Sequence, residues 1–202
     1  MVANPEEKQD LIRQAAIRAF SRKGFYNTRA EEIAREAGVA VGTIYNYFAT
    51  KEEILLSIFK TEFEERINLF RELLERNLSL PEIIQRILEA HFILLKQRRR
   101  LARVLVRERF NPGPEFQERS IELYREMITQ LEKIISIGIK QGVVRQCHPR
   151  IVANALIGVV ESISVCAMTS PEEEIEELLQ EAPHELTGLI WNGLKKGGTD
   201  DN

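Results

Sequence analysis

The segment from Val41 to Tyr47 carries hydroxyl, phenol and amide groups and not one carboxylate. Hydroxyl and amide groups donate hydrogen bonds to phosphate oxygens, and aromatic rings contact sugars and thymine methyl groups. A carboxylate at the same place would be repelled by the phosphate backbone. The residue types in this segment therefore predict contact with nucleic acid.

The candidate DNA contacts fall into two chemical groups. We expect phosphate anchoring by Thr28, Arg29, Tyr45, Tyr47 and Lys51. We expect base or methyl contacts from Val41, Gly42, Thr43 and Asn46, since asparagine can pair with adenine through two hydrogen bonds. Lys51 lies in the first turn of a predicted helix, where the helix dipole disfavours a cation, so an anionic partner such as phosphate is expected nearby. The alternative is a polar but inert surface on a three-helix packing unit.

Two short helices and a tight turn are needed to position these side chains. Thr28 is the predicted N-cap of the first helix, and Glu31 three residues later completes a capping box. Gly38 ends that helix, and a second helix follows, with Ile44 and Phe48 facing inward. This is the pattern of a helix-turn-helix unit, whose second helix enters the major groove of DNA.

The rest of the chain is predicted to be helical as well. The expected helices cover about residues 5–23, 51–77, 81–97, 114–141, 149–170 and 172–196, with an arginine-rich segment before residue 114. Apolar residues recur at helical spacing and no strand pattern occurs. The prediction is an all-α protein of about nine helices, with a three-helix helix-turn-helix domain over residues 1–50 and a second helical domain over residues 51–202.

Arginine is unusually frequent between residues 98 and 109. Arg99, Arg103 and Arg107 are four residues apart, so they share one face of a helix. Neighbouring cations repel one another, and an anionic ligand would relieve that repulsion, with arginine well suited to phosphate. The alternative is a stripe of arginines that is simply solvated.

The predicted helix over residues 149–170 is apolar on nearly all sides, so it must be buried on more than one side. The second helix of the helix-turn-helix unit, which we call the reading helix, contacts only a short stretch of DNA. Specific binding then needs two copies of it roughly 34–36 Å apart, about one DNA turn. We therefore expect a homodimer, and the residues expected at its interface are Ala155, Gly158, Val159, Ser162 and Trp191. The alternative is an ordinary core helix in a monomer.

Charge is divided unevenly along the 202 residues. Residues 1–51 hold 8 Lys and Arg against 6 Asp and Glu, and the remainder holds 20 against 25, for a net charge of −3. A mildly positive head on an acidic body suits a protein that touches DNA at one end only. The hydrophobic share of 44% is ordinary for a soluble globular protein.

The sequence offers no catalytic or metal-binding pattern. His91, His148 and His184 lack metal-ligand spacing, and no nucleophile–base arrangement, Walker loop or dinucleotide-binding glycine motif occurs. We therefore expect no enzyme, no metal and no cofactor. Cys147 and Cys166 are expected to be free thiols in a reducing cytosol. Without a signal peptide or an apolar run of about 20 residues, we predict a cytoplasmic protein with no membrane span.

A dense pattern of small and aromatic residues runs through the first quarter of the chain. Its members are Gly38, Val39, Gly42, Thr43, Ile44, Tyr45, Tyr47, Phe48, Lys51, Glu52, Glu53, Ile54 and Leu55, with Ala15, Ala16, Ala19, Phe20, Gly24 and Phe25 upstream. This pattern resembles the signature of the TetR/AcrR family of bacterial transcriptional regulators. The resemblance implies a repressor that binds a palindromic operator as a homodimer and leaves it when a small molecule binds the second domain.

The resemblance also implies a ligand cavity in that second domain. The residues expected to line it are Phe63, Phe92, Arg99, Arg103, Arg107, Phe110, Tyr124 and Met127. A basic stripe beside an apolar cavity fits a ligand with phosphates at one end and a long tail at the other. Short matches at residues 91–95, Glu108, Glu115 and residues 158–161 resemble the fatty-acyl-CoA-responsive, FadR-type branch, which implies a long-chain acyl-CoA as effector.

Three alternatives compete with this interpretation. The aromatic residues at helical spacing also fit an ordinary hydrophobic core. A multidrug-responsive repressor of an efflux gene, from the same family, would bind cationic aromatic compounds instead of acyl-CoA. An all-α interaction protein without DNA binding would retard no promoter fragment. The expected partners are otherwise a double-stranded operator, a second copy of the chain and a small-molecule effector, with no membrane.

Overall fold

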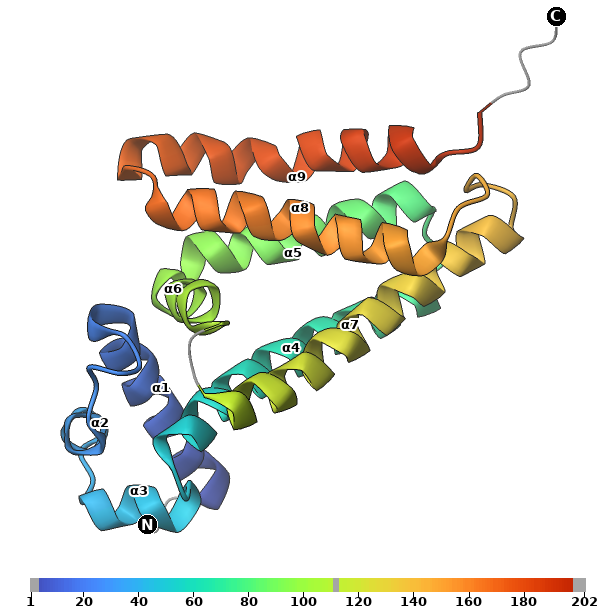
Figure 1. The fold of residues 1–202 in the computed structure, drawn as a ribbon. Helices are drawn as coiled ribbons and strands as arrows, with labels where there is room; N and C mark the ends of the chain where they lie inside the picture. Colours follow the sequence, from blue (N-terminus) through green and yellow to red (C-terminus); the bar gives the residue numbers. More distant parts are fainter. Residues whose placement is uncertain (1–3, 111–112, 198–202) are drawn as a thin grey trace, which may run out of the picture. The chain divides into compact units, whose positions relative to one another are not determined.

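The computed structural model describes residues 4–110 and 113–197. Across these ranges the chain folds into helices joined by short loops (Figure 1). The nine helices of the described ranges are α1 (Pro5–Lys23), α2 (Ala30–Ala37), α3 (Val41–Tyr47), α4 (Lys51–Glu75), α5 (Leu80–Gln97), α6 (Arg99–Glu108), α7 (Pro114–Lys140), α8 (Pro149–Thr169) and α9 (Glu172–Leu194). The prediction of an all-α protein with about nine helices is confirmed.

The two ends of α1 follow from local chemistry. The Asn4 side chain accepts a hydrogen bond from the Glu6 N–H at 3.4 Å, and the Glu7 carboxylate accepts one from the Asn4 N–H at 3.0 Å. Together these bonds form a capping box that satisfies donors at the start of the helix. Gly24 ends the helix with φ 84°, a conformation that L side chains disfavour, and its N–H donates to the Phe20 carbonyl oxygen at 2.8 Å.

The start of α2 differs from the prediction. Its N-cap is Arg29 rather than Thr28, and no side chain of the described chain caps the helix there. The Thr28 hydroxyl instead donates to the Gly24 carbonyl oxygen at 2.8 Å, so the predicted capping box with Glu31 does not form. A threonine hydroxyl can bond a carbonyl four residues back as well as an N–H ahead of it. Gly38 ends α2 with φ 66°, as predicted.

The described helices form two compact units that do not follow chain order. One unit holds Met1–Glu64 with Arg98–Leu123, and the other holds Glu65–Gln97 with Tyr124–Asn202. Hence α6 and the first turns of α7 pack with the N-terminal helices, while α4 and α7 each contribute to both units. The predicted domain boundary at residue 50 does not coincide with the limits of these packing units, and the division into two functional domains stays a prediction.

The first unit is built around phenylalanine rings. Phe20 and Phe25 have ring centroids 5.5 Å apart, and Phe59 of α4 meets Phe116 of α7 edge-on at 5.2 Å. All four side chains are buried, and such aromatic pairs add about 0.5–1.5 kcal/mol beyond the burial of their area. Ile44 of α3 is buried as well, so the short third helix is attached to this unit through its apolar side.

In the second unit α9 lies along α5 and α8 (Figure 1). The buried residues of α9 recur every three or four positions, at Ile175, Leu179, Ala182, Leu186, Ile190 and Leu194. Backbone bonds fix the end of this helix, from the Arg145 N–H to the Leu194 oxygen at 2.9 Å and from the Lys196 N–H to the Val143 oxygen at 3.0 Å. The apolar residues that recur at helical spacing in this segment therefore form the face of α9 that packs in the second unit.

A half-buried histidine joins α5 to α8 within the second unit. His91 Nε2 lies 2.8 Å from Ser164 Oγ, and that hydroxyl donates to the Val160 carbonyl oxygen at 2.7 Å. The hydroxyl proton is thus engaged, so the imidazole N–H is the donor between the two side chains. Burial, and secondarily the positive charge of Arg66, lower the pKa of His91 to about 3. The ring is therefore neutral near pH 7.

We predict that His91 makes the folded state lose stability as the pH falls from about 6.5 toward about 3. In this window the unfolded chain binds a proton that the folded chain refuses, so stability rises with pH. Urea unfolding of the wild type should lose about 2 kcal/mol more than His91→Gln between pH 7 and pH 5. His184→Gln, at an exposed position, should keep the wild-type slope. Equal slopes in the wild type and His91→Gln would contradict a buried neutral ring.

Candidate nucleic-acid and effector sites

The third helix buries one side and leaves the other open. Ile44 and Phe48 are 1% and 6% exposed, as predicted for its inward face. Gly42, Tyr45 and Asn46 lie exposed on the outward face. Because the helix contains no carboxylate, this outward face can approach a polyanion without charge repulsion.

The remaining predicted DNA contacts are three half-buried residues of α3 and one residue at the start of α2. Val41, Thr43 and Tyr47 are half-buried, and Arg29 is exposed at the N-cap of α2. A Cβ added at Gly42 would meet no described atom within 4 Å, so internal packing does not require glycine there. The missing side chain leaves open space on the outward face. The contacts of these residues with DNA stay predictions.

Thr28 has to be removed from the predicted phosphate contacts. Its side chain is 1% exposed, and its hydroxyl donates to the Gly24 carbonyl oxygen at 2.8 Å. The hydroxyl proton is engaged inside the protein, and almost none of the residue's surface faces solvent. Its role is to close the turn between α1 and α2.

Lys51 also differs from the prediction, because its partners belong to the protein. Its Nζ donates to the carbonyl oxygens of Phe25 at 2.8 Å and of Thr28 at 2.9 Å, and it lies 4.2 Å from the centroid of the Phe25 ring. Burial lowers the pKa of Lys51, while the carboxylates of Glu52 and Glu108 act in the opposite direction. The expected anionic partner is thus replaced by two carbonyl dipoles and an aromatic face.

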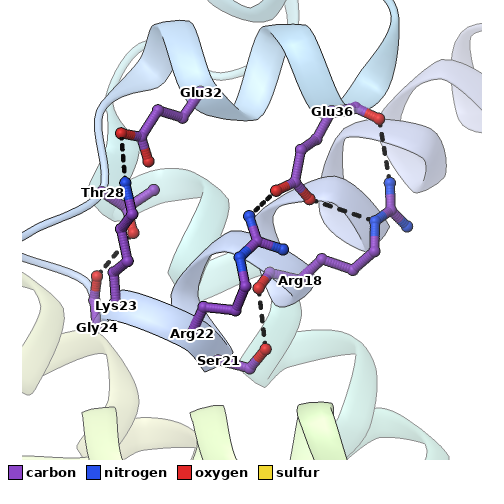
Figure 2. A network of polar contacts seen from close by, with 8 residues as sticks. All are labelled: Arg18, Ser21, Arg22, Lys23, Gly24, Thr28, Glu32 and Glu36. Atoms are coloured by element: carbon purple, nitrogen blue, oxygen red, sulfur yellow. Dashed lines mark hydrogen bonds and ion pairs between the residues drawn. The ribbon is translucent and has the colours of Figure 1, made fainter.

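Three cations of α1, Arg18, Arg22 and Lys23, are paired with carboxylates of α2 (Figure 2). Glu36 accepts from Arg18 Nε at 3.3 Å and also pairs with Arg22, and Arg18 donates to the Glu36 carbonyl oxygen at 3.2 Å. Lys23 Nζ lies 2.8 Å from Glu32 Oε1. Much of the positive charge of the N-terminal segment is therefore neutralised internally, where it holds α2 against α1.

Sequence reasoning missed this network, although a signal for it was present. Arg18 and Arg22 are four residues apart on α1, and Glu32 and Glu36 are four residues apart on α2. Each pair shares one helix face, and the charges of the two faces are opposite. The spacing shows that the faces are complementary, but only the packing of the two helices shows that they meet.

The predicted effector residues are divided between the two units. The first unit holds Phe63, Arg99, Arg103, Arg107 and Phe110, and the second holds Phe92, Tyr124 and Met127. Phe63 and Phe92 are buried, while Tyr124 and Met127 are half-buried. Their joint role in effector binding stays a prediction.

Two of these residues make contacts that the prediction did not anticipate. Arg107 donates from Nε to the Glu108 carboxylate at 2.7 Å and from Nη2 to the Phe20 carbonyl oxygen, so its guanidinium holds α1. Phe110 is 73% exposed, with the guanidinium of Arg109 4.4 Å from its ring centroid, so it does not belong to an apolar lining. Arg107 is thus engaged within the first unit and Phe110 faces solvent, and their role in effector binding stays a prediction.

The apolar helix α8 is largely uncovered in the single chain. An 18-residue window of this helix has mean hydropathy 1.9, yet only 17% of the window is buried. The predicted interface residues are all exposed or half-buried, namely Ala155, Gly158, Val159, Ser162 and Trp191. Ile151, Val165 and Leu189 add large apolar side chains that are 67%, 48% and 65% exposed. The alternative of an ordinary core helix does not fit this exposure.

The same helix corrects the expectation that no segment reaches membrane length. Among the described residues, α8 is one helix that is long and apolar enough to cross a bilayer by length and composition alone. A single helix of this kind is weak support for a membrane protein, since core helices pass the same test. Apolar surface of this extent also marks sites of protein association.

Family models match both parts of the chain. The model described as "Bacterial regulatory proteins, tetR family" matches residues 12–58, and "Tetracyclin repressor-like, C-terminal domain" matches residues 78–165. The fatty acid metabolism regulator protein of Bacillus subtilis (strain 168) is 27% identical over 183 residues, covering 90% of this chain and 94% of that relative.

Solved structures show the same architecture. The crystal structure of the transcriptional regulator FadR from Bacillus subtilis in complex with stearoyl-CoA has a TM-score of 0.83 and 25% identity, with 91% of this chain and 98% of that chain covered. The fatty acid degradation regulator FadR from Bacillus halodurans has a TM-score of 0.85 and 23% identity, with 92% and 95% covered. At 23% identity, the similarity to the Bacillus halodurans structure shows a common fold alone.

A helix-turn-helix head joined to a helical body with an open apolar face defines a DNA-binding regulator of the all-α class. The chain belongs to the TetR family of bacterial transcriptional regulators. FadR-type regulators of fatty acid metabolism are among the proteins it resembles. The resemblance drawn from the residues of the first quarter of the chain is therefore confirmed.

We predict that Lys51→Met lowers the free energy of unfolding by about 1–2 kcal/mol, because two carbonyl oxygens lose a charged donor. Lys51 is half-buried, so water replaces part of the lost interaction and keeps the loss modest. Lys60→Met, at an exposed lysine of α4 that lies 3.7 Å from Glu64, should cost less than about 0.5 kcal/mol. Urea unfolding without DNA measures both variants. If Lys51→Met kept the wild-type free energy of unfolding, the internal bonds of Lys51 would not stabilise the head. Lys51 would then again be a candidate for phosphate contact.

Proposed function

We propose that this protein is a cytoplasmic repressor that binds a palindromic operator as a homodimer and leaves it when a long-chain acyl-CoA binds. The observation that carries the DNA-binding part is the outward face of α3, which is polar and aromatic and free of carboxylates. Ile44 and Phe48 hold the opposite side of this helix in the core. A rigidly held face of this chemistry suits the major groove.

Two kinds of contact share this face. Phosphate anchoring is assigned to Arg29, Tyr45 and Tyr47, and base or methyl contact to Val41, Gly42, Thr43 and Asn46. Phosphate contacts fix the register of the helix on the duplex, while base contacts carry the sequence preference. Thr28 and Lys51 make hydrogen bonds inside the head, so we leave them out of the proposed DNA contacts.

The homodimer rests on the uncovered face of α8 with Leu189 of α9. Large exposed apolar patches on a monomer mark association sites, and here they lie on a helix with mean hydropathy 1.9. Exposed small residues, Ala155 and Gly158, let a partner helix approach closely. A second copy burying this face supplies the second reading helix that a palindromic operator needs.

The acyl-CoA effector is supported by the chain's own arginines and by its relatives. Arg100 and Arg103 are exposed three residues apart on α6, and Arg99 is half-buried beside them. The FadR structure that this chain resembles contains stearoyl-CoA, whose phosphates suit guanidinium groups and whose tail suits buried aromatic side chains. A multidrug-responsive repressor of an efflux gene would favour cationic ligands, which these arginines repel.

Release from DNA requires a difference in affinity between two states of the protein. An effector that binds the operator-incompetent state more tightly shifts the population toward it, and operator binding opposes effector binding by the same factor. A typical coupling of about 1–3 kcal/mol changes operator affinity roughly 5- to 150-fold.

We predict that a random pool of DNA duplexes, enriched on the wild-type protein, yields a palindrome with half-sites about 10–10.5 base pairs apart, or a multiple of that spacing. Asn46→Ala should weaken binding to the selected duplex by about 5- to 150-fold and leave binding to a scrambled duplex nearly unchanged. Asn68→Ala, at an exposed asparagine of α4, is the matched control. If no duplex is enriched, the proposal of sequence-specific DNA binding is wrong. If the enriched duplexes contain only one half-site, the proposal of a homodimer on a palindrome is wrong.

We predict that stearoyl-CoA raises the melting temperature and weakens binding to the selected duplex, whereas stearate and free CoA at equal concentration do neither. At one hundred times its Kd, the ligand should stabilise the folded protein by about 2.7 kcal/mol. Arg103→Ala should weaken stearoyl-CoA binding about tenfold, since it removes a charge-assisted bond to phosphate. Arg86→Ala, at an exposed arginine of α5, should not. Equal shifts with stearate and stearoyl-CoA would contradict a CoA ester as effector.

A further inference from the structure

The turn that joins α1 to α2 is held by α6, which lies far from it in the sequence. Glu108 Oε1 accepts the Phe25 backbone N–H at 3.2 Å, and this carboxylate side chain is completely buried. Arg107 Nε donates to the same oxygen at 2.7 Å, and Arg107 Nη2 donates to the Phe20 carbonyl oxygen. Two adjacent side chains of α6 therefore bind this part of the backbone, Glu108 at Phe25 in the turn and Arg107 at Phe20 in the last turn of α1.

Lys51 of α4 binds the same turn through other atoms. Its Nζ donates to the carbonyl oxygens of Phe25 at 2.8 Å and of Thr28 at 2.9 Å. Phe25 consequently has its N–H bound by α6 and its carbonyl bound by α4. We call Glu108, Arg107 and Lys51 together the turn clamp.

The turn clamp is sensitive to movement because its acceptor is a buried charge. A carboxylate without exposed surface has no water to replace a lost partner, so a shift of α6 that lengthens the bond to Phe25 is costly. Gly24 lies close by, since a Cβ added there would come within 3.6 Å of Glu108 Oε1 and 3.7 Å of the Arg107 guanidinium. Side chains of α6 thus lie directly beside the backbone of the turn, at ordinary van der Waals distance from an added methyl group.

Arginines that could meet an effector lie on the same helix as the clamp. Arg103 precedes Glu108 by five residues, or about 7.5 Å along a helix axis, and Arg99 precedes it by nine. Over so few turns a helix moves as a rigid element. A displacement produced at the arginine end of α6 therefore reaches the carboxylate at its other end.

A movement of the turn between α1 and α2 would change the position of α3, because α2 connects the two. Glu36 and Glu32 bind α2 to α1 on one side of the head, while the turn clamp fixes the chain just before α2 begins. From α2 the chain passes through Gly38 directly into α3. A change in the turn thereby changes the direction in which α3 is presented.

We propose that Glu108 is a positioning residue for operator binding, and that movement of α6 is passed to the reading head through its bond to Phe25. The positioning role needs only that the protein binds DNA. The transmission role rests on the proposed acyl-CoA effector as well. A structural role alone would make Glu108 important for stability and leave the operator affinity of the folded protein unchanged.

The first experiment separates positioning from stability. Glu108→Ala removes the acceptor of the Phe25 N–H and of Arg107 Nε, whereas Glu108→Gln keeps an oxygen for the Phe25 N–H and loses the charge that faces Arg107. Binding to the selected duplex should weaken about tenfold in Glu108→Ala and less in Glu108→Gln, with binding to a scrambled duplex nearly unchanged in both. Glu118→Ala, at an exposed glutamate of α7 in the same unit, should match the wild type.

The circular dichroism of each variant shows whether it is folded at the assay temperature. Folded Glu108→Ala with wild-type affinity for the selected duplex overturns the positioning role. If Glu108→Ala is unfolded, Glu108→Gln decides, since a loss of about threefold or more supports the role and wild-type affinity overturns it. The ratio of selected to scrambled binding is the readout that a purely stabilising residue would not move.

The second experiment follows the Phe25 amide by hydrogen exchange. Exchange at Phe25 should be faster in Glu108→Ala than in the wild type, while the buried residues Ala15 and Ala19 of α1 keep their protection. Saturating stearoyl-CoA should speed exchange at Phe25 in the wild type. If stearoyl-CoA binds and weakens operator binding without this change, the transmission role is overturned. If stearoyl-CoA does not bind, the proposed effector fails, and the Glu108 variants still decide the positioning role.

Discussion

A seven-residue helix cannot hold its own geometry, and the reading head is arranged around that constraint. Isolated helices of this length are unstable in water, and α3 has no side-chain cap at Ala40 and no charged pair along its length. The carboxylates that would normally stabilise a helix N-terminus are the groups that a DNA surface excludes. The burial of Ile44 and Phe48 therefore has to do what local interactions do in longer helices.

The need to hold α3 in place also explains how the cations of the head are used. Arg18, Arg22 and Lys23 are bound to carboxylates of α2. Lys51 is bound to backbone carbonyls of the turn before α2, and Arg107 is bound to the Phe20 carbonyl of α1. Positive charge is thus used to build a rigid frame beside the reading helix. In our proposal, recognition of DNA then depends mainly on the hydroxyl, phenol and amide groups of α3, in a head whose residues 1–51 hold 8 Lys and Arg against 6 Asp and Glu.

Local signals explain which parts of the fold the sequence could predict. Asn4, Gly24 and Gly38 set helix ends through bonds and backbone conformations within a few residues, and these ends were predicted correctly. The inward side of α3 was also predictable, because Ile44 and Phe48 are one helical turn apart and strongly apolar.

The errors arise where several partners compete for one polar group. Thr28 could cap α2 or bond backward to Gly24, and nothing in the spacing of the residues decides between these. Lys51 was expected to need an anion, but the carbonyl oxygens that it binds come from a turn more than 20 residues earlier. Arg107 was placed correctly on the face of a helix, yet the sequence does not show which helix that face would meet.

The two ends of α6 have opposite requirements, and this difference is what makes the helix suited to carry a signal. Arg100 and Arg103 are exposed, as groups must be that capture a ligand from solution. Glu108 is fully buried, as a group must be whose bond to the backbone cannot be replaced by water. Coupling between sites needs an element with two arrangements that both sites can bias. In our proposal α6 is that element, with accessible cations at one end and a buried anion at the other, and no long pathway of side chains is needed.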